Sequence, residues 1–216
     1  MGLRINDTIP DLTVETDHGT ISLHGWVGDS WAVIFSHPKD FTPVCTTEFG
    51  AVAALKDEWA KRGVKVLGIS VDGVEEHGRW KEDIRVAGNA APDFPIAADH
   101  DLAVSKAFDM LPAEAYLPEG RTPNDTATVR SVFIVGPDKK LKLSMTYPMS
   151  VGRNFSEILR AIDALQTAAG RGVATPADWT PGDPVIIPVA VSNEEARARF
   201  GDYETVLPYL RKVRLG

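Results

Sequence analysis

Short apolar runs alternate with amphipathic segments over the first two thirds of the chain, and this alternation most constrains the fold. WAVIF (31–35) and VKVLGISV (64–71) have the length and apolar content of buried strands. Between them, Thr42 is suited to an N-cap, Pro43 to the first helical position and Gly63 to the end of the helical region. A strand, a helix and a second strand in this order predict an α/β layer.

The same patterns continue along the chain. We expect a hairpin over 11–23, a helix over 75–87, a strand over 94–99, a short helix over 102–109, a loop over 111–128, a hairpin over 129–147 and a helix over 154–165. The fold class is therefore α/β, a mixed central sheet flanked by helices. From about Gly170, prolines interrupt every longer pattern. We accordingly divide the chain into a domain at 1–169 and a small C-terminal extension at 170–216, with one helix near 193–200.

The charge pattern argues against several classes of protein. The net charge is −7 and no run of five basic residues occurs, which argues against nucleic acid binding and against a polybasic membrane patch. No apolar run is long enough for a transmembrane segment, and MGLRINDTIP at the start lacks the apolar core of a signal peptide. Together with a single cysteine, these features predict a cytoplasmic protein in a reducing compartment.

Cys45 is the only cysteine of the chain, and it stands third in the helix expected after Thr42. Backbone N–H groups and the positive end of the helix dipole face that position, and both favour a thiolate over a thiol. An inert cysteine packed beneath the sheet is the alternative that position alone leaves open.

Arg130 begins an apolar strand, VRSVFIV (129–135), whose two faces are both apolar. Such a strand is expected inside a sheet, and a buried arginine needs an anionic partner. The candidate partners are a Cys45 thiolate and Glu48. Two hypotheses follow: a plain ion pair between Arg130 and Glu48, or an electropositive pocket around a reactive sulfur.

The stretch Pro38-x-x-x-Thr42-x-x-Cys45 matches P-x-x-x-T-x-x-C, the active-site signature of the peroxiredoxins. The longer run SHPKDFTPVCTTE resembles the one-cysteine subfamily related to mammalian peroxiredoxin six, within the AhpC/TSA superfamily. The likeness continues through GPDKKLKL (136–143) and GRNF (152–155) and covers nearly the whole chain. It implies a thioredoxin-like fold and a thiol-dependent enzyme that reduces hydrogen peroxide and organic hydroperoxides.

The resemblance also implies a role for each residue of the signature. Cys45 would be the peroxidatic nucleophile, and Thr42 would donate to the peroxide and position it through its hydroxyl. Pro38 would shield the pocket. Arg130 would stabilise both the thiolate and the transition state.

Three further pocket residues and the partners come from the same resemblance. Arg153 in GRNF matches a second pocket arginine, Glu48 would orient the arginines, and His37 matches a histidine near the sulfur. At least a homodimer is implied, or a larger homo-oligomer, with the extension packing on the partner subunit. Because no second cysteine is present, a sulfenic acid on Cys45 needs an external thiol, such as glutathione or a redox protein.

A second constellation suggests a different enzyme class. GDSWA (28–32) resembles the lipase motif G-x-S-x-G, and in the mammalian relative a phospholipase activity is attributed to a histidine, this serine and an aspartate. The matching positions are His24, Ser30 and Asp138. Ala32 replaces the last glycine, and the segment precedes a strand instead of following one. Calcium-independent acyl-ester hydrolysis, or a holdase or scaffold role, therefore stays an alternative.

The sequence contains no pattern typical of a metal or cofactor site. The histidines at 18, 24, 37, 77 and 100 do not pair at metal-ligand spacing with one another or with Cys45, which predicts no metal. C-x-x-C, G-x-G-x-x-G and a P-loop are absent, which argues against a thioredoxin-type disulfide exchanger and a nucleotide cofactor. We therefore expect an enzyme that works without a cofactor.

Overall fold

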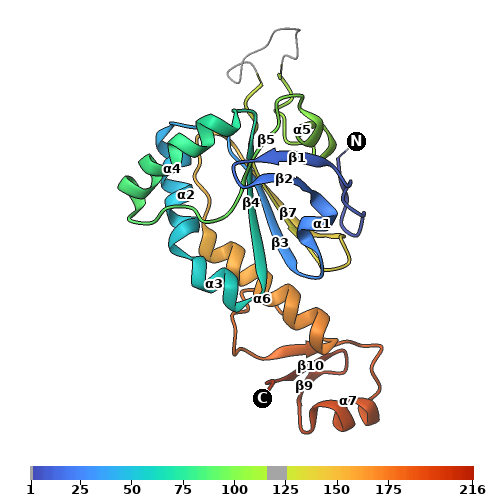
Figure 1. Ribbon diagram of the computed structural model, residues 1–216. Coiled ribbons are helices and arrows are strands. Elements are labelled where there is room, and N and C mark those ends of the chain that lie inside the picture. Colours follow the sequence, from blue (N-terminus) through green and yellow to red (C-terminus); the bar gives the residue numbers. More distant parts are fainter. Residues whose placement is uncertain (1, 116–125) are drawn as a thin grey trace. The chain divides into compact units, whose positions relative to one another are not determined.

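The computed structural model describes residues 2–115 and 126–216, so part of the expected loop at 111–128 lies outside the described residues. The chain divides into two compact units, Met1–Phe155 and Ser156–Gly216 (Figure 1). Helix α6 (Phe155–Arg171) belongs almost wholly to the second unit, whereas the expected boundary placed it with the first. The domains at 1–169 and 170–216 stay a prediction.

The first unit is built on a seven-stranded sheet in the order β2-β1-β5-β4-β3-β6-β7. Its strands are β1 (Thr13–Thr16), β2 (Gly19–Ser22), β3 (Trp31–Ser36), β4 (Val64–Ser70), β5 (Ile96–Ala98), β6 (Arg130–Val135) and β7 (Leu141–Tyr147). β3, β4 and β5 run parallel, while β1 pairs antiparallel with β2 and β5, and β6 pairs antiparallel with β3 and β7. This mixed sheet confirms the α/β class expected from the sequence.

Helices cover both faces of this sheet, with α1 and α5 on one face and α2 and α4 on the other (Figure 1). The helices of this unit are α1 (Leu23–Val27), α2 (Pro43–Ala54), α3 (Lys56–Lys61), α4 (Val74–Gly88) and α5 (Ala103–Ala107). The single helix expected after Thr42 is two helices, because Leu55, with φ −91° and ψ 15°, departs from helical geometry. Helix α1 was not expected; the Ser22 hydroxyl caps it by accepting from the Gly25 N–H.

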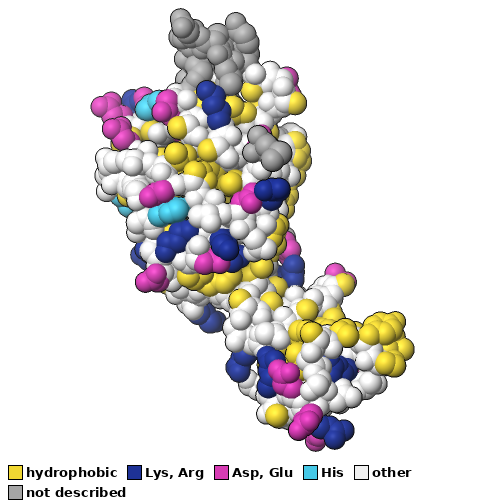
Figure 2. Space-filling view, turned by 90° about the vertical axis from the view of Figure 1, so that its right-hand side faces the viewer, with side chains coloured by type: hydrophobic (Ala, Val, Ile, Leu, Met, Phe, Trp, Pro, Cys, Tyr) yellow, Lys and Arg dark blue, Asp and Glu magenta, His cyan; other side chains and the backbone are white. Residues whose placement is uncertain are grey.

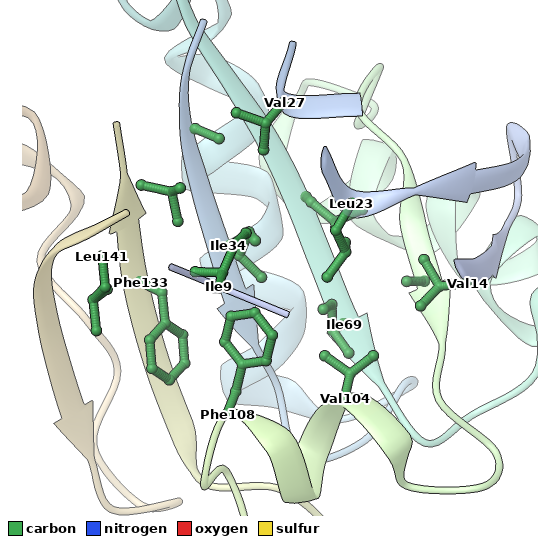
Figure 3. Close-up of a cluster of buried hydrophobic side chains, with 14 of the residues drawn as sticks. Ile9, Val14, Leu23, Val27, Ile34, Ile69, Val104, Phe108, Phe133 and Leu141 are labelled. Carbon is green, nitrogen blue, oxygen red and sulfur yellow. The ribbon is translucent and has the colours of Figure 1, made fainter. Parts of the chain in front are cut away.

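A hydrophobic core lies between the sheet and helices α1 and α5 (Figure 3). Helix α1 contributes Leu23 and Val27 to this core. The α5 segment contributes Val104 and Phe108, and these side chains pack around strand residues such as Ile34. These side chains are at most 1% exposed, and burial stabilises each by roughly 1.5–3 kcal/mol. This packing fixes which face of each strand is turned away from the core.

The polar residues of interest lie on the opposite face of the sheet. Phe35 of β3 pairs with Val132 of β6, and side chains that pair in this way point to the same face. Arg130 lies two residues before Val132 and His37 two residues after Phe35, so period-2 alternation directs both to that face. Phe35 contacts Phe49 of α2 there, with ring centroids 4.9 Å apart. The face covered by α2 and α4 therefore carries the candidate site.

The second unit contains a small sheet that the sequence did not indicate. Its strands β8 (Val185–Ile187), β9 (Glu204–Leu207) and β10 (Leu210–Val213) are antiparallel in the order β8-β10-β9. Helix α7 (Asn193–Phe200) confirms the helix expected near 193–200. The unit has a core of its own, made of Val173, Trp179, Val185, Ile187, Val191, Ala196 and Val213. In the part of the chain that the structure describes, no helix is long and apolar enough to cross a bilayer.

Candidate active site

Cys45 lies in the first turn of α2, and its side chain is completely buried. Thr42 is the N-cap residue, Pro43 is the first helical residue, and Pro38 is buried in the loop that leads from β3 to this helix. Backbone N–H groups of the first turn have no partner within the helix, as the sequence indicated. The Thr42 hydroxyl does not cap them: it donates to the Lys39 carbonyl oxygen at 2.9 Å, within the loop.

Arg130 reaches the sulfur from the start of β6. Its side chain is buried, and β6 lies between β3 and β7, which confirms the interior strand expected from the sequence. Arg130 Nη1 lies 3.3 Å from the Cys45 Sγ and donates to Glu48 Oε2 at 2.7 Å. Arg130 Nε donates to the Met149 carbonyl oxygen at 2.8 Å. Both candidate partners of Arg130 are thus present together, and the ion pair and the sulfur belong to one buried group.

Glu48 binds a second arginine, Arg153. The backbone N–H and Nε of Arg153 donate to Glu48 Oε1 at 2.8 and 2.9 Å, and its Nη2 donates to Oε2 at 2.8 Å. Arg153 Nη1 donates to the carbonyl oxygens of Ser36 and Ser131, both at 2.9 Å. Burial opposes the charge of Glu48, but the Arg153 hydrogen bonds and the charges of both arginines outweigh it and hold the pKa of Glu48 below its ordinary value. Glu48 is therefore a carboxylate at neutral pH.

Two buried arginines, Arg130 and Arg153, share a single buried carboxylate, Glu48. Arg130 and Arg153 stay protonated, so with Glu48 they leave one positive charge uncompensated. An unpaired charge inside a protein is costly. An anion at the position of the Cys45 sulfur, which lies beside Arg130, would balance this charge. Electropositive surroundings of this kind are what make a cysteine reactive.

A second buried polar group lies on the same face of the sheet. Asp40 Oδ1 lies 2.6 Å from His37 Nε2, and Asp40 Oδ2 lies 2.7 Å from Nδ1 of His77 on α4. All three side chains are buried. Burial opposes the charge of Asp40, but the hydrogen bonds from His37 and His77 outweigh it and lower the pKa of Asp40 to about 2. Burial also lowers the pKa of His37 from its ordinary value.

The group of His37, Asp40 and His77 is the one that the sequence did not reveal. Its ligating atoms lie within 4.8 Å of one another, a spacing that metal ligands can have. The separations of 2.6 and 2.7 Å are those of hydrogen bonds, whereas two nitrogen or oxygen ligands of a tetrahedral zinc ion stand about 3.3 Å apart. The residues present thus fit a hydrogen-bonded group better than a metal centre, and the absence of a metal stays a prediction.

Two weak signals could have pointed to this group. His37 and Asp40 are three residues apart in SHPKD, and His77 and Trp80 are three residues apart on the expected helix 75–87. Trp80 stacks on His37 with ring centroids 5.0 Å apart, and its indole N–H donates to the Thr46 hydroxyl at 3.0 Å. The approach of α4 to the loop is a tertiary contact, which no local pattern encodes.

The residues proposed for an acyl hydrolase do not form a constellation. His24 Nε2 lies 2.7 Å from the Ile9 carbonyl oxygen, and Asp138 accepts from Lys142 Nζ at 2.6 Å. Within residues 2–115 and 126–216, no hydrogen bond joins Ser30 to His24 or Asp138. A serine nucleophile needs a base within hydrogen-bond reach. The geometry does not favour this alternative.

Comparisons with known proteins agree along the whole chain. The AhpC/TSA family matches over residues 5–144, and the C-terminal domain of 1-Cys peroxiredoxin matches over residues 164–202. "Peroxiredoxin PRX1, mitochondrial" of Saccharomyces cerevisiae is 50% identical over 212 residues, which cover 97% of this chain and 80% of the relative. "1-Cys peroxiredoxin B" of Oryza sativa subsp. indica is 51% identical over 201 residues, covering 92% of this chain and 89% of the relative.

Two solved structures share the fold. A mutant of the peroxiredoxin 6 of Arenicola marina is matched with a TM-score of 0.91 at 43% identity, covering 100% of this chain and 99% of that one. A yeast mitochondrial 1-Cys peroxiredoxin, described with a thiol resolving mechanism via glutathione/thioredoxin systems, is matched with a TM-score of 0.90 at 47% identity, covering 99% of this chain and all of that one. These matches confirm the thioredoxin-like fold expected from the sequence.

Proposed function

Because this chain belongs to the AhpC/TSA family and is a one-cysteine peroxiredoxin, a thiol peroxidase, we propose that Cys45 is its peroxidatic sulfur. The observation that carries the assignment is the Arg130 guanidinium 3.3 Å from the Cys45 Sγ, with Glu48 shared between Arg130 and Arg153. This arrangement favours the thiolate, which is the reactive form of cysteine.

In the first half of the cycle, the Cys45 thiolate attacks one oxygen of a hydroperoxide. The S–O bond forms as the O–O bond breaks, the sulfur is oxidised to a sulfenic acid, and the leaving oxygen takes a proton to become water or an alcohol. Arg130 acts here as a hydrogen-bond donor toward the oxygens as charge moves from sulfur to oxygen, the kind of stabilisation that contributes most to many enzymes. Arg153 and Glu48 hold Arg130 in place.

Thr42 and Pro38 complete the proposed peroxide pocket. Because the Thr42 hydroxyl already donates its proton to the Lys39 carbonyl oxygen, its lone pairs are left to accept the O–H of the peroxide. In this proposal Thr42 accepts from the peroxide, whereas the resemblance implied that it donates to the peroxide. Pro38, buried beside His37, excludes water from the same side, and His37 adds a buried ring near the site.

In the second half of the cycle, a thiol from outside must restore Cys45. The first thiol displaces water from the sulfenic acid and leaves a mixed disulfide, and a second thiol releases Cys45 as it forms a disulfide with the first. The single cysteine requires this route, since no second cysteine of the chain can resolve the sulfenic acid. We assign the role to a small thiol such as glutathione or to a redox protein, in line with the glutathione/thioredoxin systems described for the yeast protein.

We propose a homodimer as the smallest assembly. Strand β7 is at the edge of the seven-stranded sheet, and an open edge is a natural place for a second strand to pair. The second unit exposes Val189, Val206, Leu207 and Tyr209, by 71, 45, 42 and 63%. Figure 2 shows hydrophobic side chains on the surface of this unit, which supports packing of the extension on a partner. Analytical ultracentrifugation of the wild type and of Tyr209→Asp tests this assembly: a monomeric wild type contradicts it.

We place the protein in the cytoplasm, on the argument that a free, reactive thiol needs a reducing compartment. The yeast relative carries a mitochondrial name, so the mitochondrion is the competing location. Cell fractionation with an antibody against the native protein separates the two.

Hydrogen peroxide consumption tests the function directly. Wild type is expected to consume peroxide continuously with glutathione or dithiothreitol present. Without a thiol it is expected to consume one peroxide per Cys45 when peroxide is not in excess, whereas Cys45→Ser is expected to be inactive. Intact-mass spectrometry of the wild type is expected to show one added oxygen, and two or three when peroxide is in excess and no thiol is present. Continued turnover by Cys45→Ser contradicts the assignment.

A further inference from the structure

Asp40 and His77 have no role in the proposed chemistry, although both are buried and charged groups are rarely buried without a reason. Asp40 lies in the loop between β3 and α2, His77 lies on α4, and the third member of the group, His37, follows β3 directly. Each oxygen of the Asp40 carboxylate binds a different imidazole, at 2.6 and 2.7 Å. Two segments of the chain, the loop after β3 and helix α4, thus meet at one carboxylate.

Hydrogen-bond chemistry determines which nitrogens of the two rings carry protons. A carboxylate only accepts, so His37 Nε2 and His77 Nδ1 both donate to Asp40. His77 Nε2 lies 3.3 Å from the Ala97 carbonyl oxygen, which also only accepts, so His77 carries a proton on each nitrogen. The Asp40 carboxylate and the His77 imidazolium then cancel in charge, and His37 is left as a neutral ring.

This proton count leaves a bare acceptor at His37 Nδ1. It is the one buried side-chain nitrogen or oxygen without a hydrogen-bond partner among the residues that the structure describes. A buried polar atom without a partner is uncommon in proteins and calls for an explanation. The charged groups around the ring are Asp40, His77 and Asp72, the last of which accepts the Asp40 backbone N–H at 2.9 Å. None of them offers a donor to Nδ1.

The His37 ring is placed close to the helix that carries the sulfur. It contacts Phe49, at a centroid distance of 4.6 Å, and Trp80, at 5.0 Å, and these two rings also contact each other, at 4.8 Å. Phe49 is four residues after Cys45, one turn further along the same side of α2. The backbone gives a second link, because the Ser36 carbonyl oxygen just before His37 accepts from Arg153 at 2.9 Å.

We propose that Asp40 and His77 are positioning residues of the peroxidase, which together hold His37 in the tautomer whose Nδ1 is a free acceptor for an O–H group entering the pocket. The O–H belongs to the hydroperoxide before attack or to the sulfenic acid on Cys45 after it. His37 accepts a hydrogen bond, and no bond breaks in this step. The inference rests on the proposed peroxidase function, but the tautomer can be measured without peroxide.

Nitrogen-15 NMR of the histidine rings, at neutral pH and without peroxide, tests the tautomer in the wild-type protein. In the expected spectrum the signals assigned to His37 are those of a neutral ring protonated at Nε2, and the signals assigned to His77 are those of a ring protonated at both nitrogens. A His37 ring protonated at Nδ1 overturns the proposal. So does a stoichiometric metal ion, found by elemental analysis of the purified protein and bound to these rings in place of the protons.

Asp40→Asn tests the consequence for catalysis, and Asp72→Asn is its matched control. An asparagine offers one accepting oxygen and one donating nitrogen, so it cannot accept from both rings. Asp40→Asn is expected to change the tautomer of one ring and to lower kcat/KM for hydrogen peroxide by about 10- to 100-fold, the effect known for carboxylates that orient metal-bound histidines. Asp72→Asn removes a buried charge from the same region without touching either ring, and is expected to keep the tautomer.

Three results overturn the proposal at this stage. Wild-type kcat/KM in Asp40→Asn shows that Asp40 positions nothing. An equal loss of rate in Asp72→Asn, with the His37 tautomer unchanged, shows that loop packing matters and the tautomer does not. A loss of rate in Asp40→Asn accompanied by a loss of Cys45 alkylation shows that the pocket itself has collapsed. A wild-type protein that consumes no peroxide refutes the proposed function instead, and the NMR spectrum still decides the tautomer.

Discussion

Two buried carboxylates lie on the same face of the sheet, and they differ in the bases that bind them. Glu48 is held by Arg130 and Arg153, and Asp40 by His37 and His77. An arginine keeps its proton at any pH at which the fold exists, whereas a histidine can gain or lose one near neutral pH. The partners of the arginine-bound carboxylate therefore keep the same charge at every pH. The partners of the histidine-bound carboxylate are of a kind whose charge can change near neutral pH.

The difference matches the distance of each carboxylate from the reacting atom. Glu48 shares Arg130 with the Cys45 sulfur, so the charge that favours the thiolate does not vary with pH. Asp40 acts on the site through His37, whose ring packs on Phe49. The interaction with the Cys45 sulfur, which must not vary with pH, is thus made by an arginine. The interaction of Asp40 with the site is made through a histidine and depends on which ring nitrogen carries the proton.

Replacing each carboxylate in turn by its neutral amide tests whether arginine and histidine partners differ in their contribution to stability. Glu48→Gln leaves two buried arginines without their anion, and breaking a buried ion pair in this way costs about 3–5 kcal/mol. Asp40→Asn is expected to cost less, because an imidazole, unlike a guanidinium, can be a neutral ring when no anion is beside it. Urea denaturation at neutral pH measures both. Equal losses in the two variants would show that arginine and histidine partners are equivalent here.

Arg130→Met tests the fixed charge at the sulfur. Removing one preorganised donor is expected to slow peroxide reduction by about 10² or more, equivalent to about 2.7 kcal/mol in the activation free energy. Single-turnover peroxide kinetics, followed by the loss of the Cys45 thiol, give the rate.

Arg211→Met is a matched control for this variant. Arg211 is 4% exposed, but its hydrogen bonds go to neutral acceptors, the Asn193 side chain and the carbonyl oxygens of Pro188 and Val191. Its loss is expected to lower the stability of the second unit and to leave the peroxide rate unchanged. A wild-type rate in Arg130→Met would remove that residue from the transition state.

The lowered pKa values of Asp40 and His37 predict that the free energy of unfolding depends on pH. Asp40 has a pKa that falls from 3.8 in the unfolded chain to about 2 in the fold, so protons bind more tightly to the unfolded state. The resulting stability, about 2 kcal/mol, is complete above pH ~4 and is lost as the pH falls toward 2. The pKa of His37 is also lowered from its ordinary value of 6.5. The stability that the neutral His37 ring contributes is therefore present above pH 6.5 and is lost as the pH falls below that value.

Denaturation by urea at a series of pH values separates the two carboxylates. Glu48, whose pKa is lowered as well, contributes only below its ordinary value of 4.5. Between pH 5 and 6.5 the slope for wild type is therefore expected to come from His37, and Glu48→Gln is expected to preserve it. A slope that disappears in Glu48→Gln and persists in His37→Gln would reverse this assignment.

The smallest effects are expected at a third carboxylate, Asp138, which is exposed and pairs with Lys142. Asp138→Asn and Ser30→Ala are each expected to change stability by no more than about 0.5 kcal/mol and to leave peroxidase activity unchanged. Hydrolysis of a phospholipid substrate, measured in parallel, is expected to be absent in wild type. Hydrolysis that disappears in Ser30→Ala but not in Cys45→Ser would restore the acyl-hydrolase alternative.

The features that could be predicted from the sequence follow from strong local rules. An arginine at the start of a strand with two apolar faces must be buried and must have an anion, which identified Arg130 together with Glu48 and Cys45. Apolar runs and a Thr-Pro helix start were enough to locate β3, α2 and β4. The break at Leu55 was not visible, because helical residues on both sides of it give one continuous pattern.

The features that were missed depend on contacts between distant segments. Asp40 and His77 are 37 positions apart in the chain, and only the packing of α4 against the loop brings them together. The sheet of β8, β9 and β10 is built of strands of three or four residues among prolines and turns, too short for alternation to be visible. The Thr42 hydroxyl could meet either the free N–H groups of the helix start or a loop carbonyl, and it bonds to the carbonyl of Lys39.

The Cys45 sulfur has no exposed surface, and this has a consequence for the kinetics of the whole cycle. Hydrogen peroxide has two heavy atoms and needs only a slight opening to reach the sulfur, whereas a tripeptide thiol is an order of magnitude larger in heavy atoms and needs a wider opening. The rate of oxidation is therefore set by the chemical step at the sulfur, and the rate of reduction by the opening of the protein around the sulfur. At high thiol concentration the rate of repair is limited by how often the pocket opens, and it becomes the same for every thiol small enough to enter the opened pocket.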